Sequence, residues 1–188
     1  AFGGVCRCGP GTSQMLQQSS VHLIKDAGPA VSRRDGGLVP HIEENHKTLL
    51  ALCAHLEDFA DALPDAIDRQ ECLIMSRALG PMVHRIQEFE EQQVFPILLA
   101  WQAIKPEMTE TIDRLKIEHQ LDSCYAEDVQ DMLRGLGEGR PTLSPDAAGF
   151  MLRGFFEAMR RHVAFEQQFV VPLVGLAMRH VPVPDNRN

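Results

Sequence analysis

Apolar residues recur every three or four positions along four long stretches of this chain of 188 residues. The stretches cover about residues 40–63, 65–100, 107–136 and 144–179. An α-helix turns once in about 3.6 residues, so this spacing gathers the apolar side chains on one face of each helix. Stretches rich in Val, Ile, Thr and Tyr, which favour strands, are scarce. The pattern therefore predicts four long amphipathic helices.

Proline, glycine and serine mark where these helices begin and end. Pro64 follows the first helix, Pro106 precedes the third, and Gly137 ends the third. Ser144 followed by Pro145 is typical of a helix start, because the serine side chain accepts a hydrogen bond from a free backbone N–H and proline fits the first turn. The helices are therefore joined by connections of moderate length.

Prolines also fall inside two of the predicted helices. Proline lacks the backbone N–H of a regular helix, so we expect a bend near Gly80 and Pro81 and a kink or break at Pro172. Neither changes the fold class. Four amphipathic helices with such connections favour an all-α, up-down-up-down antiparallel four-helix bundle over residues 39–180.

The two ends of the chain differ in composition from the predicted bundle. Residues 1–38 are rich in glycine, serine, glutamine and proline, which predicts a flexible N-terminal tail. Cys6 and Cys8 lie within it, but two thiols fall short of the four ligands that a structural metal site usually has. Residues 181–188, which alternate valine and proline at their start, predict an extended C-terminal tail.

Composition and charge narrow the class of protein. The chain length suits one domain, and 44% hydrophobic residues indicate a globular chain. A net charge of −8, with no basic stripe or aromatic stacking platform, argues against nucleic acid as a partner. There is no apolar run of about 18 residues that could cross a membrane. We also find no phosphate loop, nucleotide-binding fingerprint or nucleophile–base motif, which favours binding or sensing over turnover.

The cysteines indicate a reducing compartment. Five scattered cysteines do not form a disulfide framework, so we expect a cytoplasmic protein. The first residues lack the basic and then apolar layout of a secretory signal.

Each apolar stripe is interrupted by residues that can bind a metal ion. A buried imidazole or carboxylate destabilises a fold unless a partner or an ion compensates it, and this nitrogen and oxygen donor set suits iron, manganese or zinc. In helix order the interruptions are His46, Glu90, His119 with Asp122, and His162 with Glu166. By contrast, His41, His55, His84 and Glu91 lie off the stripes, and we expect them in solvent or at the edge.

A single pair such as His162 and Glu166 is weak evidence, since pairs one turn apart are common on helix surfaces and in cores. Interruptions in all four helices favour a metal site. The alternative is a metal-free interaction module, whose polar core residues fix the register of the helices. Apolar residues near the site, Phe155 and Phe169 among them, are candidates for a dry lining or for plain core.

Two segments of the chain resemble each other. Residues 89–96 are similar to residues 165–172, which lie 76 positions later, and Glu90 corresponds to Glu166. The same offset takes His162 to Ile86, which cannot bind a metal.

Together these motifs resemble the hemerythrin-like, HHE cation-binding family. They are residues 44–49 on the first helix, 89–96 on the second, 118–119 on the third, and His162 with Glu166 and the following Pro172 on the fourth. The similarity covers roughly residues 39–178. It implies an up-down bundle around a non-haem di-iron centre. The implied histidine ligands are His46, His119 and His162, the implied bridging carboxylates are Glu90 and Glu166, and Asp122 is an additional ligand or an acceptor that orients one.

The chain departs from the family pattern at two positions. Ile86 stands where the family usually has a histidine one turn before the second-helix glutamate, and Ser123 replaces a second histidine on the third helix. The resemblance therefore leaves three states open: a pair of irons with an exchangeable water, a single metal, or a lost site. The expected function is binding or sensing of oxygen, nitric oxide or iron. The alternatives are a di-iron enzyme that reduces peroxide or oxygen, and the metal-free module. The expected partner is a diatomic ligand or peroxide, and no protein partner is indicated.

Overall fold

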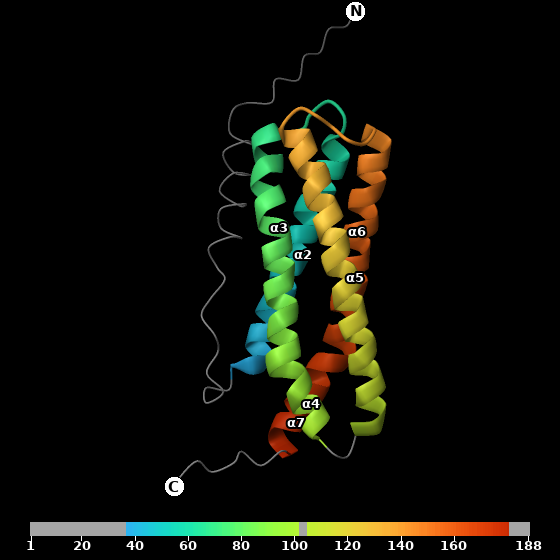
Figure 1. Ribbon diagram of the computed structural model, residues 1–188. Helices are drawn as coiled ribbons and strands as arrows, with labels where there is room; N and C mark the ends of the chain where they lie inside the picture. Colours follow the sequence, from blue (N-terminus) through green and yellow to red (C-terminus); the bar gives the residue numbers. More distant parts are fainter. Residues whose placement is uncertain (1–36, 102–104, 181–188) are drawn as a thin grey trace, which may run out of the picture.

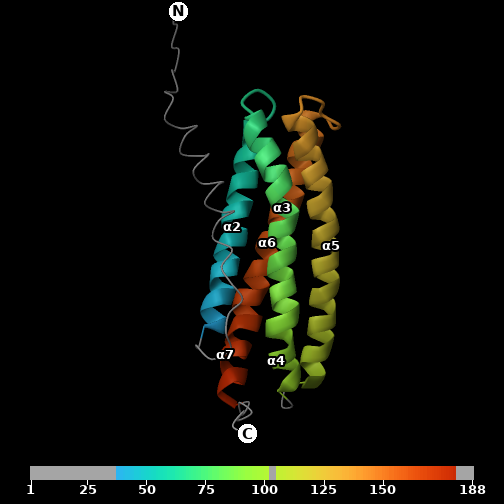
Figure 2. The same cartoon turned by 60° about the vertical axis from the view of Figure 1, so that its left-hand side comes forward.

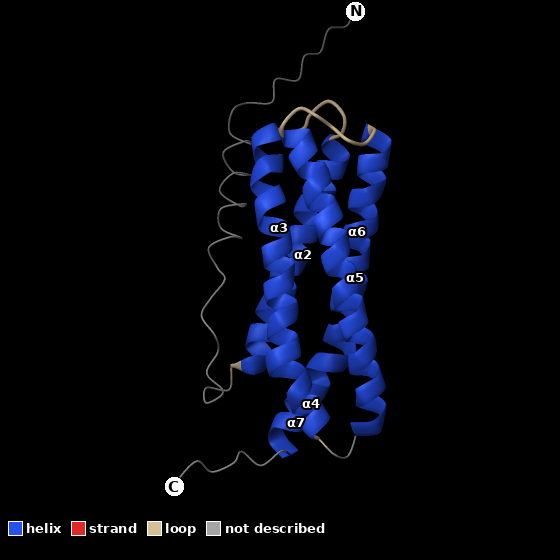
Figure 3. Cartoon of the chain, viewed as in Figure 1, coloured by secondary structure: helices blue, strands red, loops and turns tan. Residues whose placement is uncertain are grey.

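The computed structural model describes residues 37–101 and 105–180. Within these residues the chain forms helices and connections, with no strand, as Figure 3 shows. The predicted C-terminal tail and nearly all of the predicted N-terminal tail, with Cys6 and Cys8, lie outside the described residues. No described helix is both long and apolar enough to cross a membrane.

Four long helices run side by side and alternate in direction along the chain (Figures 1 and 2). This is the predicted antiparallel bundle. The second and fourth helices each continue through one π-helical turn into a short α-helix, and α4 and α7 therefore lie at the same end of the bundle. The elements are α2 (Leu38–Ala62), α3 (Arg69–Phe89), η1 (Glu90–Val94), α4 (Phe95–Ala100), α5 (Lys105–Gly137), α6 (Pro145–Phe165), η2 (Glu166–Val170) and α7 (Val171–His180).

Side-chain caps fix two of the helix starts. The Ser144 hydroxyl accepts a hydrogen bond from the backbone N–H of Ala147 at 3.2 Å, as its sequence context predicts. The Asp68 carboxylate accepts bonds from the backbone N–H groups of Gln70 and Glu71 at the start of α3. These caps satisfy backbone donors that have no partner within the helix.

The two π-helical turns each precede a proline, but Pro81 within α3 has no such turn before it. That helix continues unbroken through Pro81, where the sequence predicts a bend. The backbone widens instead at η1 and η2, which end just before Pro96 and Pro172 come into the following helices. In each wide turn the last N–H, that of Phe95 or Val171, bonds to the carbonyl oxygen five residues earlier.

The wide turn η2 changes which side chains face the core. An extra residue in the turn rotates the following positions relative to a regular α-helix. Val170 is buried, whereas the side chain of Phe169 points outward with 48% of the residue exposed. The expectation that Phe169 lines the site is therefore wrong, while Phe155 is fully buried.

The apolar core is divided into two clusters. The larger one fills the half of the bundle that contains Leu56, Leu79, Leu133 and Leu152. The smaller one fills the other half, where α4 and α7 lie, and includes Phe95 and Val174. Along every helix the predicted metal ligands fall between members of the two clusters, so they form a polar layer across the bundle.

Not every histidine off the stripes is in solvent. His55 is buried, which contradicts the expectation, because α3 supplies a partner: His55 Nε2 lies 3.1 Å from Oε1 of the buried Glu71. The ring of His55 also packs edge-on against Phe59. His84 is exposed, as predicted, and His41 is half-buried with its ring centroid 4.4 Å from that of Phe89.

Candidate metal centre

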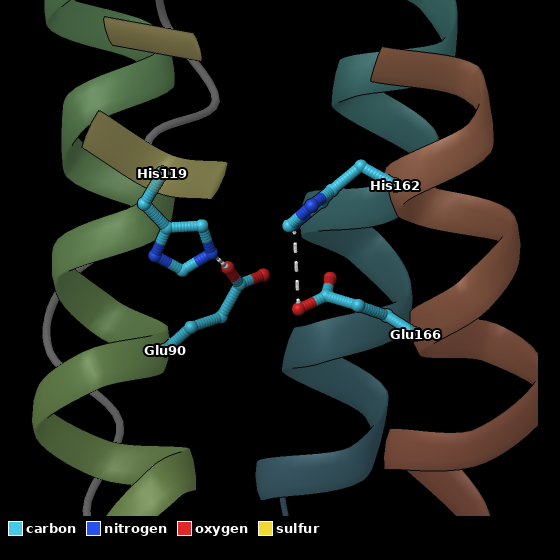
Figure 4. A group of neighbouring side chains, drawn as sticks. All are labelled: Glu90, His119, His162 and Glu166. Atoms are coloured by element: carbon cyan, nitrogen blue, oxygen red, sulfur yellow. Dashed lines mark ion pairs between the residues drawn. The ribbon is translucent and has the colours of Figure 1, made fainter. Parts of the chain in front are cut away.

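The six residues predicted to bind metal are all buried in the described bundle. Four of them, Glu90, His119, His162 and Glu166, each offer a ligand atom within 4.8 Å of the others. Figure 4 shows Glu90 and His119 facing His162 and Glu166 across the interior. The structure therefore brings together one or more groups from each of three helical segments that are far apart in sequence.

His46 completes this layer from α2. Its Nε2 atom lies 2.9 Å from Oε2 of Glu166 and 4.0 Å from Oε1 of Glu90. Neither its ring nor either carboxylate reaches solvent to any extent. His46 thus adds an imidazole from a further helix beside both glutamates.

The two glutamates each divide their oxygens between two sets of histidines. Glu90 turns Oε1 towards His46 and Oε2 towards His119, whose Nε2 is 3.4 Å away. Glu166 turns Oε2 towards His46 and Oε1 towards His162, whose Nε2 is 3.5 Å away. The oxygens thus outline two candidate positions for a cation. We call them the four-ligand position, with His119 and His162, and the three-ligand position, with His46.

The layer contains polar atoms that the protein alone leaves without partners. In the described part of the chain, every fully buried side-chain nitrogen or oxygen that lacks a hydrogen-bond partner belongs to a residue of this layer. An unpaired buried polar atom costs about 1–3 kcal/mol, so five of them together favour an additional partner. The atoms are His46 Nδ1, Glu90 Oε1, His119 Nε2, His162 Nδ1 and Glu166 Oε1.

The pKa values of the two carboxylates are shifted in opposite directions. Burial raises the pKa of Glu90 well above its usual value, and the Glu166 carboxylate raises it further. Burial also acts to raise the pKa of Glu166, but the nearby His162 and His46 rings outweigh it and hold that pKa at about 2. Two carboxylates at this depth cannot both remain charged without a cation between them.

The surroundings shift the pKa values of His119 and His162 in opposite directions. Burial lowers the pKa of His119, which favours the neutral ring that binds a metal. Burial acts in the same direction on His162, but Glu166, Asp122 and Glu118 outweigh it and raise the pKa of that ring.

Two further carboxylates contact these rings from outside the layer. Oε1 of Glu91 lies 2.9 Å from Nδ1 of His119, and Oε2 of Glu118 lies 3.5 Å from Nδ1 of His162. A carboxylate on Nδ1 orients the ring and leaves Nε2 free for a metal. Glu91 lies at the edge of the bundle, as predicted, but the sequence did not predict its contact with His119. The only signal for that contact was the position of Glu91 next to Glu90. The signal is weak, because the corresponding residue of the second repeat is Gln167.

Asp122 lies outside the group of four. It is buried on α5 and lines a surface groove together with Glu118 and His162. Burial raises the pKa of Asp122, although His162 beside it acts in the opposite direction.

The two departures from the family pattern are filled by ordinary core contacts. Ile86 is buried within the larger apolar cluster. Ser123 donates a hydrogen bond from its hydroxyl to Oε1 of Gln87 at 2.8 Å, which joins α5 to α3. His84, one helical turn earlier than Glu88, is exposed and offers no substitute ligand.

An antiparallel four-helix bundle with a buried layer of imidazoles and carboxylates defines a helical metal-binding protein. The sequence profile of the hemerythrin HHE cation-binding domain matches residues 37–174. The chain therefore belongs to the hemerythrin HHE cation-binding family. Searches of curated proteins and of solved structures found no significant match.

Proposed function

We propose that this protein binds a pair of non-haem iron ions in the polar layer and uses them to bind or sense oxygen, nitric oxide or iron itself. The observation that carries the proposal is the division of the carboxylate oxygens of Glu90 and Glu166 between His46 on one side and His119 and His162 on the other. A carboxylate that faces two cation positions is a natural bridge between them.

The donor set fits iron at both positions. His119 and His162, with one oxygen from each glutamate, would hold the first ion, and His46 with the remaining two oxygens would hold the second. Mixed imidazole and carboxylate ligands suit iron, which in such a site can bind small ligands and change its oxidation state. The three-ligand position has fewer protein donors, so it supports an exchangeable ligand there.

The surrounding residues exclude water and hold the rings. The two apolar clusters close the layer along the bundle axis. Glu91 accepts the Nδ1 proton of His119 and thereby directs Nε2 inwards. The unpaired buried atoms count against the metal-free module, because a bundle without an ion would leave them uncompensated.

Metal analysis of anaerobically purified protein tests the proposal. Protein from iron-supplied cells is expected to contain about two irons per chain and to gain an absorption band on oxidation. His46→Ala and Glu166→Ala should lower the iron content. His84→Ala and Glu88→Ala, which alter exposed residues of the same types, serve as matched controls. Unchanged iron content in His46→Ala and Glu166→Ala would overturn the proposal, and steady peroxide turnover with a reductant would favour an enzyme.

A further inference from the structure

The polar layer is closed at both ends of the bundle. The larger apolar cluster packs on one side of it and the smaller cluster on the other. A hydrated cation cannot pass through either close-packed cluster without opening the fold. A metal ion must therefore reach the layer from the side, between two helices.

A groove of about 330 Å³ lies on the seam between α5 and α6. Its charged lining residues are Arg114, Glu118 and Asp122 from α5 and Arg161 from α6, and His162 and Phe165 of α6 complete its inner side with Leu121 and Ala158. The two carboxylates and the two guanidinium groups balance in charge. Of the four clustered ligands, His162 alone lines it. His162 is also the most exposed of them, at 7%.

His162 forms the wall between this groove and the layer. Its Nε2 atom faces Oε1 of Glu166 at 3.5 Å. Its Nδ1 atom lies 3.5 Å from Oε2 of Glu118, is buried, and has no hydrogen-bond partner. An unpaired nitrogen of a nine-tenths buried ring therefore adjoins the groove.

Glu118 connects this nitrogen with solvent. Its side chain is 40% exposed, and its other oxygen, Oε1, lies 3.4 Å from Nε of Arg114. The Arg114 guanidinium also stacks over the Phe165 ring, 4.7 Å from the centroid, which holds it at the side of the groove. An incoming cation would compete with Arg114 for Glu118, while the more buried Asp122 lines the same groove.

We propose that this groove is the entrance through which a divalent metal ion reaches the layer. Glu118 and Asp122 replace water molecules of the hydrated ion, and His162 delivers it to the four-ligand position. Carboxylate oxygens are suited to this exchange because hard and borderline divalent cations bind them readily. The inference rests on the proposed metal binding of the layer.

Glu91 provides a matched control for Glu118. Both carboxylates lie against Nδ1 of a layer histidine, and their side chains are exposed to nearly the same extent, 38% and 40%. Glu91, however, contacts His119 on the α3 side and does not line the groove. Glu91 and Glu118 can both orient a histidine ring, but only Glu118 is placed to take part in the entry of a metal ion through the groove.

The experiment compares the rate of metal uptake with the equilibrium affinity. Metal-free full-length protein is mixed anaerobically with Fe²⁺, and separately with Co²⁺, and uptake is followed by stopped-flow absorption. Glu118→Gln removes a negative charge from the groove, and Ala158→Phe fills the groove with a ring. Each should slow uptake roughly tenfold, which is the low end of the range over which electrostatic steering changes association rates. Final metal content should stay within about twofold of that of the starting protein. Glu91→Gln weakens the orientation of His119, so its affinity should fall, but its uptake should not slow because Glu91 does not line the groove. Any loss of affinity in Glu118→Gln should be no larger than that in Glu91→Gln.

A bulky control separates groove filling from general disturbance. Ala51→Phe places the same ring on an exposed position of α2 and should leave uptake unchanged. The proposal is overturned if Glu118→Gln and Glu91→Gln slow uptake equally, if both change affinity alone, or if Ala51→Phe acts like Ala158→Phe. If the unaltered protein takes up neither ion at equilibrium, the proposed metal binding itself fails, and that result is distinct from a change in rate.

Discussion

The two candidate cation positions differ in the number of histidines that face them. His119 and His162 face the same position, whereas His46 faces its position as the single imidazole. The position with more donors should bind its ion more tightly, since each added ligand displaces another water molecule. Unequal positions make the effect of each histidine specific.

Replacing His46 should therefore separate the two ions. His46→Ala is expected to lower metal content from about two ions to about one, because the four-ligand position keeps all its donors. His119→Ala should instead lower the affinity for the ion at the four-ligand position. Anaerobic titration with Co²⁺ measures both, and equal loss of both ions in His46→Ala would contradict the assignment.

Ile86 offers a gain-of-ligand test. It lies one helical turn before Glu90, so Ile86→His would set an imidazole beside that carboxylate. We expect roughly tenfold tighter binding of the weaker ion, the scale on which single ligand groups affect metal affinity. Competition with a chelator measures the change. Ile86→Gln is the matched polar control with a poor ligand, and equal effects of the two variants would exclude coordination by the new ring.

Sequence reasoning identified the layer residues but not all of their neighbours. Isolated polar residues within an apolar stripe are visible from periodicity alone, which is how His46 and Glu90 were found. His55 was misjudged because its burial depends on Glu71, a residue of the next helix. Pairing across helices leaves no trace in the periodicity of either one.

The two π-helical turns are the distinctive feature at the level of elements. Glu90 opens one and Glu166 opens the other, and a proline follows six residues after each glutamate. Proline alone does not cause the wide turn, because α3 accommodates Pro81 without one. The repeat of residues 89–96 at 165–172 marked these places in the sequence, but a single extra residue in one turn is too small a shift for periodicity to reveal.

Removing one residue from a wide turn tests its importance. After deletion of Gln168, Val170 and Val174 would follow Glu166 by three and seven positions, which keeps both on the inner face of a regular α-helix. We expect a folded bundle of unchanged helicity whose metal affinity falls about tenfold or more, because loss of the wide turn that begins at Glu166 would change the backbone geometry from which its carboxylate reaches the layer.

Circular dichroism and metal titration follow these two properties. A deletion of the exposed Thr142, in the connection between α5 and α6, controls for shortening the chain. Wild-type affinity in the Gln168 deletion would show that the wide turn does not place the ligand.

For the whole molecule, a bound ion should join the four helices. A ligand that binds only the folded state adds about 2.7 kcal/mol of stability at a hundred times its dissociation constant. Metal-loaded protein should therefore melt several degrees higher than protein stripped with a chelator, a difference that calorimetry measures. Glu166→Ala should show a much smaller difference, and an equal melting temperature with and without metal would contradict the stabilising role.

The fold class was predictable because long amphipathic helices with moderate connections have few ways to bury their apolar faces. The sequence does not predict how the helices are aligned with one another along the bundle axis. This alignment depends on the packing of whole helix faces, such as those around Leu56 and Leu133. The groove beside His162 likewise follows from how α5 and α6 pack together, which neither sequence segment encodes by itself.

The division of the core into two clusters has a consequence for local opening. The cluster around α4 and α7 is the smaller, and the layer separates it from the rest of the interior. Once the ion is stripped, amide hydrogens of α4 and α7 should exchange with deuterium well before those of the opposite half. Metal loss would then register as fraying of one end of the molecule, while the remainder keeps its native protection.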